Sequence, residues 1–333
     1  MAITLEEAKV GMADKVVQTV IDEFRRGSLL IDKLVYDDAV SPGTGGSTLT
    51  YGYTKVKTPS TASFRKINGS YSPSEAKREK ATVDLKILGG NFKIDRVLAG
   101  STQKAIDEVN FQMQEKIKGA INLFHYTVIN GDSNGTDEFD GLDKLLLGSN
   151  TEYNKEVSAY IDLSTSDKLD KNSQAFLDSL DDFLSTLDGK PTMLMGNSKL
   201  ITKIKSVARR AGYLTHSEDA FGKKVDGYDN IPLVDLGEYV KVSGDAATTE
   251  SCVPIETRKN GEADLEGLTD LYAVVIGLEG FHGVTLTGDN IITTNMPDLK
   301  GAGTVKEGDV EMVAAVALKN SRKAGVFRNI KVK

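Results

Sequence analysis

The sequence predicts an α+β fold, and three observations lead to this prediction. From residue 101 to residue 130, apolar residues recur at steps of three and four, which is the spacing of one buried helix face. Apolar and polar residues alternate at 49–53 and again at 81–88, which is the spacing of strands. Between about 145 and 295, helix-like and short strand-like runs follow one another, so helices and strands share one chain.

The composition of the 333 residues limits what the chain can be. Hydrophobic residues make up 39% and charged residues 27%, and no apolar run approaches the ~20 residues of a membrane helix. The first residues hold no apolar signal core, so we expect neither secretion of the protein nor its insertion into a membrane. The single cysteine, Cys252, cannot form an internal disulfide, which suits a reducing compartment. The net charge of −7 argues against tight nucleic-acid binding by the whole surface, although a local basic patch stays possible.

The first element is an amphipathic helix predicted at residues 4–26. Its apolar stripe includes Val16 and Val20, and Thr4 with Glu7 forms a capping box at its start. The sequence leaves open whether this helix packs on its own core or docks on a neighbour.

The next element is a long hairpin predicted at residues 49–88. Its middle, 58–80, is polar and charged, so little in it could form a core. Because a two-stranded ribbon is at best marginally stable alone, it should lie against something, and another subunit is a candidate. Gly89-Gly90 is interpreted as a hinge between this ribbon and the body.

The helix at 101–130 would be roughly 40 Å long, well above the mean for globular proteins. Ser101 or Thr102 can cap its start, and Asn130-Gly131 is a candidate left-handed stop. Its stripe contains Ile106, Val109, Met113, Ile117, Ala120, Ile121, Phe124 and Val128. Periodicity alone favours an ordinary core helix over a helix that forms the backbone of an extended structure.

The second half of the chain alternates between the two kinds of element. We predict helices at about 165–187 and at Lys199–Ala211, the second capped by Asn197. Strands are predicted at 192–195, 231–234, 271–276, 311–316 and 326–332.

No motif in the sequence carries recognisable catalytic or ligand chemistry. The acidic loop 132–143 lacks the glycine that a calcium loop needs at its sixth position, and a solvated loop is the favoured interpretation. His125, His216 and His282 lie far apart, and no phosphate loop, dinucleotide fingerprint or nucleophile elbow occurs. We therefore predict no catalytic, cofactor-binding or metal-binding residues, and a protein that is not an enzyme.

The order of these parts resembles the major capsid protein of tailed bacteriophages, whose fold encapsulins share. The resemblance covers nearly the whole chain and lies in the sequence of its pieces. It is carried by ATVDLKILGGNFKIDRVLAG (81–100), the helix from Ser101, NGDSNGTDEFDGL (130–142), TMLMGNSKLITKIKSVARRAGYL (192–214) and LYAVVIG (271–277).

The resemblance implies a division of the α+β chain into the parts of that fold. Residues 1–27 would be the N-terminal arm helix, and residues 49–88 the extended E-loop. The peripheral P-domain would combine 28–48, 89–144 and 296–333, with 101–130 as its spine helix, and the A-domain would span 145–295.

The resemblance also implies a function and a set of partners. Copies of the chain would assemble into hexamers and pentamers of an icosahedral head shell enclosing double-stranded DNA, bound without sequence specificity. A separate scaffolding protein, a portal and decoration proteins would be further partners. The protein would be located in the virion, after assembly in the host bacterial cytoplasm. The residues expected to touch neighbouring subunits are Val16, Val20, Phe64, Arg65, Lys66, Tyr71, Lys77 and Arg78.

Two other functions stay open. An encapsulin would share the fold but enclose cargo enzymes, and the content of the shell, DNA or protein, would distinguish it. A cytosolic enzyme with an unrecognised site in 145–295 would instead be a monodisperse monomer or dimer that forms no shell.

Overall fold

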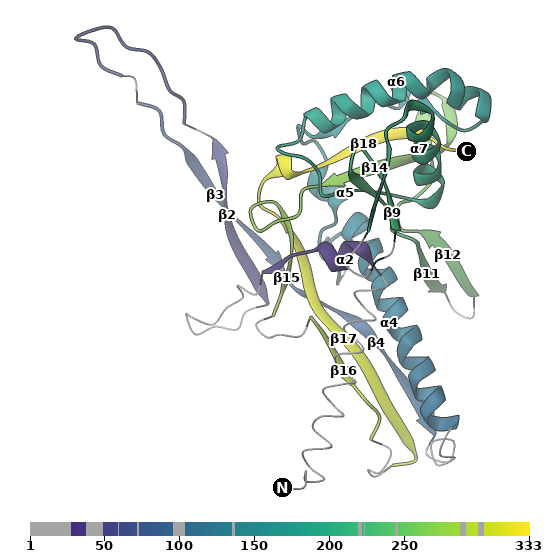
Figure 1. Cartoon of the computed structure of the whole chain (residues 1–333). Helices are drawn as coiled ribbons and strands as arrows, with labels where there is room; N and C mark the ends of the chain where they lie inside the picture. The colour runs from purple at the N-terminus through teal and green to yellow at the C-terminus, as the bar shows by residue number, and fades with distance from the viewer. Residues whose placement is uncertain are drawn as a thin grey trace.

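The fold was analysed in a computed structural model (Figure 1). It describes residues 28–37, 49–58, 60–71, 73–95, 104–134, 137–218, 222, 224–243, 246–286, 291–298 and 303–333. The predicted helix at 4–26, with Val16 and Val20, lies outside these residues, as do Ser101 and Thr102.

The described helices differ greatly in length. The longest, α4 (Lys104–Asn130), forms the spine, and α6 (Ser166–Ser185) and α7 (Ser198–Ala211) belong to the second half of the chain. The short helices are α2 (Leu29–Lys33), α5 (Leu142–Leu146) and the 3-10 turns η2 (Val157–Ala159) and η3 (Ser321–Lys323). No helix in the described ranges has the length and apolar character needed to cross a membrane.

The first sheet is built on one long antiparallel pair, β4 (Lys86–Asp95) and β17 (Val305–Leu318). Inward residues alternate with more exposed ones along β4 and along β17 as far as Val313, as expected for strands with one buried face, whereas 314–318 are all buried. On the other edge of β17 lie β16 (Ile292–Asn295) and β15 (Phe281–Thr285), and β1 (Tyr36–Asp37) pairs in parallel with β15. This sheet and α4 run side by side along the lower part of the molecule in Figure 1.

The second sheet lies at the other end and is covered by α6 and α7 (Figure 1). Its main path in the described chain runs β5-β18-β14-β7-β10-β9-β8, with β6 also on β18 and β13 on β14. The bounds are β5 (Glu152–Tyr153), β6 (Ile161–Asp162), β7 (Met193–Gly196), β8 (Leu214–Glu218), β9 (Lys224–Tyr228), β10 (Ile231–Asp235), β13 (Glu256–Asn260), β14 (Ala263–Val274) and β18 (Ala324–Lys331).

Two ribbons leave the body. The larger pairs β2 (Thr50–Thr58) with β3 (Lys77–Asp84) in antiparallel register, as the sequence predicted. The smaller pairs β11 (Glu238–Ser243) with β12 (Ala246–Ser251). In Figure 1 the larger ribbon projects far from both sheets.

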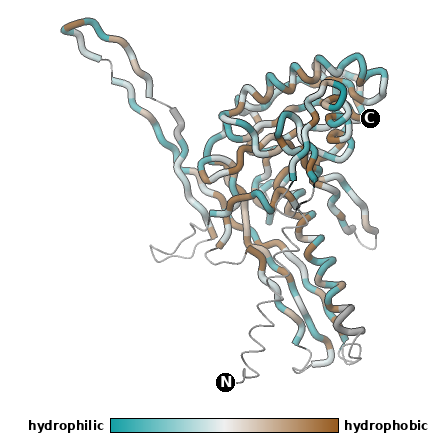
Figure 2. Tube along the Cα trace, in the orientation of Figure 1, coloured by the Kyte–Doolittle hydropathy of each residue, from teal (hydrophilic) through white to brown (hydrophobic). Residues whose placement is uncertain are grey.

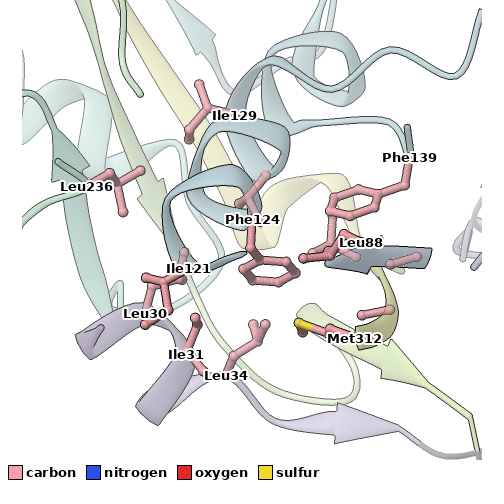
Figure 3. Close-up of a cluster of buried hydrophobic side chains, with 14 of the residues drawn as sticks. Leu30, Ile31, Leu34, Leu88, Ile121, Phe124, Ile129, Phe139, Leu236 and Met312 are labelled. Atoms are coloured by element: carbon pink, nitrogen blue, oxygen red, sulfur yellow. The ribbon is translucent and has the colours of Figure 1, made fainter. Parts of the chain in front are cut away.

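The buried face of α4 organises the first core. The predicted stripe is confirmed from Val109 to Val128, all of it buried. Phe124, which has no exposed surface, lies among α2, β4, β17 and the loop after α4, and its ring packs 6.0 Å from that of Phe139 (Figure 3). The spine helix therefore binds together segments that are remote in sequence.

The predicted stop of this helix is correct in position but wrong in mechanism. The helix ends at Asn130, yet neither Asn130 nor Gly131 has a left-handed backbone. Gly131 is needed for space, because a Cβ there would meet Phe139 O at 2.2 Å and Thr127 O at 2.6 Å. Gly141 N–H donates to Gly131 O at 2.8 Å, so the returning loop packs directly on the helix end.

The predicted hinge at Gly89-Gly90 is also wrong, because both glycines lie inside β4, paired with Glu311 and Val310. A Cβ on Gly89 would meet Val310 O at 2.0 Å, so this glycine permits close strand approach. The ribbon strand β3 and the body strand β4 are separated at Leu85.

Most of the later predictions are confirmed with shifts of a few residues. Asn197 caps α7 by accepting from the Leu200 N–H at 2.9 Å, and Gly212 ends it with φ 79°. The division into domains stays a prediction, but the strand pairing mixes its segments. β15, from the proposed A-domain range, pairs with β17, and β18, from the proposed P-domain range, pairs with β14.

Candidate assembly surfaces

The base of the β2–β3 ribbon is fixed to the body by two tyrosines. Tyr51 is buried and donates through its hydroxyl to Asp37 at 2.8 Å, and the Lys319 amine lies 5.7 Å from its ring centroid. Tyr53 donates to Leu318 O at 3.2 Å. The ribbon therefore leaves the body at a defined place.

The outer part of the ribbon has no such support. Every described residue from 60 to 80 is exposed. At the far end, Phe64, Ile67 and Tyr71 have relative exposures of 108%, 92% and 63%. Figure 2 shows this apolar end far from the body. Large exposed apolar side chains that gather at the end of one segment are typical of a surface that another molecule covers.

The predicted contact residues of the ribbon fall into two groups. Phe64, Arg65, Lys66 and Tyr71 lie at the tip, where the Arg65 guanidinium stacks 5.4 Å from the Tyr71 ring centroid. Lys77 and Arg78 begin the returning strand β3, and their side chains are exposed. Their contacts with another subunit stay a prediction.

The ribbon and the rest of the chain have opposite charge. Residues 50–80 contain seven Lys or Arg and two Glu, a net charge of +5. Since the whole chain carries −7, the remainder carries −12. A basic ribbon that projects from an acidic body is electrostatically complementary to the body of a second copy.

A buried histidine connects the spine to two other segments. His125 Nδ1 lies 2.9 Å from Leu236 O, and its Nε2 lies 2.5 Å from Ser28 Oγ. A carbonyl only accepts, so Nδ1 carries the proton and Ser28 donates to Nε2. The same Ser28 Oγ accepts from the Ile31 N–H and caps α2. Burial lowers the pKa of His125 to about 4, although the Leu236 carbonyl opposes the shift, so the ring is neutral at pH 7.

The acidic loop after the spine is held by a lysine. Lys144 Nζ contacts Asp132 Oδ1 at 2.7 Å and Asp140 Oδ1 at 2.6 Å. The hydrogen bond to Lys144 is the main cause of the lowered pKa of Asp132. Among the described residues, no three His, Cys, Asp or Glu side chains are arranged to hold a metal ion.

A second charged cluster, which sequence reasoning missed, lies at the end of the second sheet beside α5. The Arg258 guanidinium makes a two-point contact with Asp270, at 2.7 and 2.8 Å. Arg328 donates to Glu152 at 2.5 Å, to Asp143 at 2.7 Å and to Asp270 at 3.0 Å. Burial opposes the charge of Arg328, but Asp270 and Asp143 outweigh it and raise its pKa.

This cluster lines a cavity of about 350 Å³. Its lining residues come from α4, α5, β5, η2, β13, β14 and β18, so no local spacing in the sequence could show it. The sequence signal for this charged cluster was limited to charged residues inside strand-like runs, such as Asp270.

Comparison with known proteins gives the fold. No family model and no curated protein matches the sequence. Among solved structures, the chain resembles the holo-SrpI encapsulin complex from Synechococcus elongatus, with a TM-score of 0.59 and 13% identity over 91% of this chain and 88% of that chain. The capsid of a native GTA particle gives 0.53 and 12% over 92% and 90%, and Mycobacterium phage Bobi gives 0.52 and 12% over 92% and 91%.

These likenesses extend over about nine tenths of each chain. The chain therefore has the capsid fold, the α+β fold of phage major capsid proteins and encapsulins that the resemblance predicted. At such low identity the comparison concerns the fold, and function has to be argued separately.

Proposed function

We propose that this chain is the major capsid protein of a tailed bacteriophage, which assembles into hexamers and pentamers of an icosahedral head around double-stranded DNA. The observation that carries the proposal is the ribbon. In a chain whose fold is that of shell proteins, a 31-residue segment of charge +5 projects from a body of charge −12 and ends in exposed apolar side chains. Such a segment is stabilised best when it lies on another copy.

Repeated weak contacts would hold the shell together. Each subunit gives one ribbon and receives another, so a closed shell gains from many contacts that are individually modest. The acidic body supports packaging of DNA without tight or sequence-specific binding. A separate scaffolding protein, a portal and decoration proteins are proposed as partners, with assembly in the host bacterial cytoplasm and the virion as the final site. The proposed role is structural and not catalytic.

The test is expression of the chain in bacteria with and without its neighbouring genes, followed by negative-stain microscopy and chromatography. We expect closed particles with visible five-fold and six-fold clusters, and nuclease-protected DNA in particles made during infection. A monomer or dimer that never forms particles would contradict the proposal and favour an enzyme with a site in 145–295.

An encapsulin shell is the second candidate, and the likeness to the SrpI encapsulin complex favours it. Under this alternative the particles would form from the single chain and would contain a co-purifying protein instead of nucleic acid. Mass spectrometry and absorbance ratios of purified particles separate the two functions.

A further inference from the structure

The cavity beside α5 has a wall and a rim of different character. The wall side chains are largely buried: Arg328 is 12% exposed, Arg258 18%, Glu152 6% and Asp270 5%. These charges pair with one another, so they hold the cavity open without offering a strong site of their own. We call this cavity, which is lined by residues at the end of α4, from α5 and from the second sheet, the junction pocket.

The rim offers acids next to an apolar residue. The Asp143 and Glu256 side chains are 47% and 48% exposed, and Leu147 is 72% exposed. Asp143 Oδ1 accepts from Arg328 and from the Tyr272 hydroxyl, and Glu256 Oε2 accepts from Arg258, so the other oxygen of each carboxylate keeps acceptor capacity. The rim lysine, Lys155, lies 3.6 Å from Glu152, so its charge is directed to the wall. The mouth therefore suits a cation adjacent to an apolar group.

The ribbon tip presents that combination. Phe64 is fully exposed, and the next residue, Arg65, carries a guanidinium that Tyr71 holds in place. An arginine fork matches carboxylate geometry, and Tyr71 reduces its freedom before binding. A volume of about 350 Å³ lies at the lower end of the range for ligand pockets, roughly 300–1,000 Å³.

From this charge and shape complementarity we infer that the junction pocket of one subunit receives the ribbon tip of a second copy, with Arg65 on Asp143 and Glu256 and Phe64 on Leu147. The inference rests on the proposed function, because it names the surface on which the ribbon lies.

The first test reverses charges across the contact. Arg65→Glu and Glu256→Lys should each lower particle yield by about tenfold, and the double variant should restore most of it, because opposite charges face each other again. Lys80→Glu and Glu262→Lys make the same charge changes at exposed positions outside the tip and the pocket, and should leave the yield within about twofold. Thermal midpoints of the unassembled subunits show that each variant folds.

The second test traps the contact in assembled particles. A Phe64→Cys/Leu147→Cys variant, oxidised after assembly, should run as a ladder of linked chains on a non-reducing gel, whereas each single-cysteine variant should not. The inference would be overturned, and the proposed function left intact, if the wild type forms particles but the double-cysteine variant gives no linked ladder and the charge-reversed pair is no better than its single variants. Failure of the wild type to form particles would instead count against the proposed function.

Discussion

At the scale of single residues, Phe124 sets the stability of the first core. Its ring has no exposed surface and is surrounded by side chains from four segments (Figure 3). Truncation to Ala should lower the free energy of unfolding by roughly 3–5 kcal/mol, and Ile117→Ala by roughly 2–5 kcal/mol. We expect insoluble or unfolded subunits, measured as soluble yield and thermal midpoint. Well-folded Phe124→Ala subunits with only an assembly defect would show that α4 is an interface element.

Two glycines, Gly119 inside α4 and Gly131 directly after its last residue, make a matched pair. Gly131→Ala places a Cβ against backbone oxygens that cannot move aside, so we expect a loss of about 1–3 kcal/mol or more. At Gly119, a Cβ would meet nothing within 4 Å, and Ala is the better helix former, so Gly119→Ala should be neutral or stabilising by up to ~1 kcal/mol. Urea unfolding of both variants decides this, and equal midpoints would contradict it.

At the scale of elements, the ribbon should be dispensable for folding. Deletion of residues 58–80 removes a segment whose described residues from 60 onward are exposed, and it spares Tyr51 and Tyr53, which fix the ribbon base. We expect a soluble subunit with an unchanged thermal midpoint that forms no particles. A subunit that unfolds after this deletion would place the ribbon in its own core.

The N-terminal arm is tested in the same way. Val16→Asp and Val20→Asp together should impair assembly more than subunit folding, because a buried unpaired carboxylate costs a few kcal/mol wherever that face is dry. Particle yield and subunit midpoint are measured side by side. Equal losses in both would indicate that this helix packs on its own core.

At the scale of the whole molecule, His125 couples the start of the described chain, the spine and the segment after β10. Its pKa of about 4 lies below the ordinary 6.5, so the unfolded chain binds the proton more readily than the folded chain. The stability from the neutral ring is complete above pH 6.5 and is lost as pH falls toward 4. We expect the midpoint of unfolding to fall over this window.

The control for this effect is His125→Asn, whose amide can still donate to Leu236 O and does not titrate. It should reduce the pH dependence of the midpoint between pH 6.5 and 4.5, the window over which the wild-type ring gains its proton on unfolding. If the wild type and His125→Asn lose stability in parallel, the ring is not responsible.

The sequence by itself determined the local elements. The three-and-four spacing of apolar residues located the buried face of α4, strand alternation located the ribbon, and Asn197 marked the start of α7. These features depend on neighbours along the chain, because helix and strand periodicity and capping are local. The order of the elements was enough to predict the capsid fold.

Only the tertiary structure decided which strands pair and which charges meet. β18 joins β14 although β17, its neighbour along the chain, joins β4, and nothing in either strand's own spacing distinguishes the two sheets. The need for glycine at 131 arises because the loop brings Phe139 back onto the helix end. His125 is hydrogen-bonded to Leu236, and Arg328 forms ion pairs with Asp143 and Asp270. The partners in these contacts are up to 185 residues apart. Their pairing is fixed by packing and register in three dimensions, which no local pattern records.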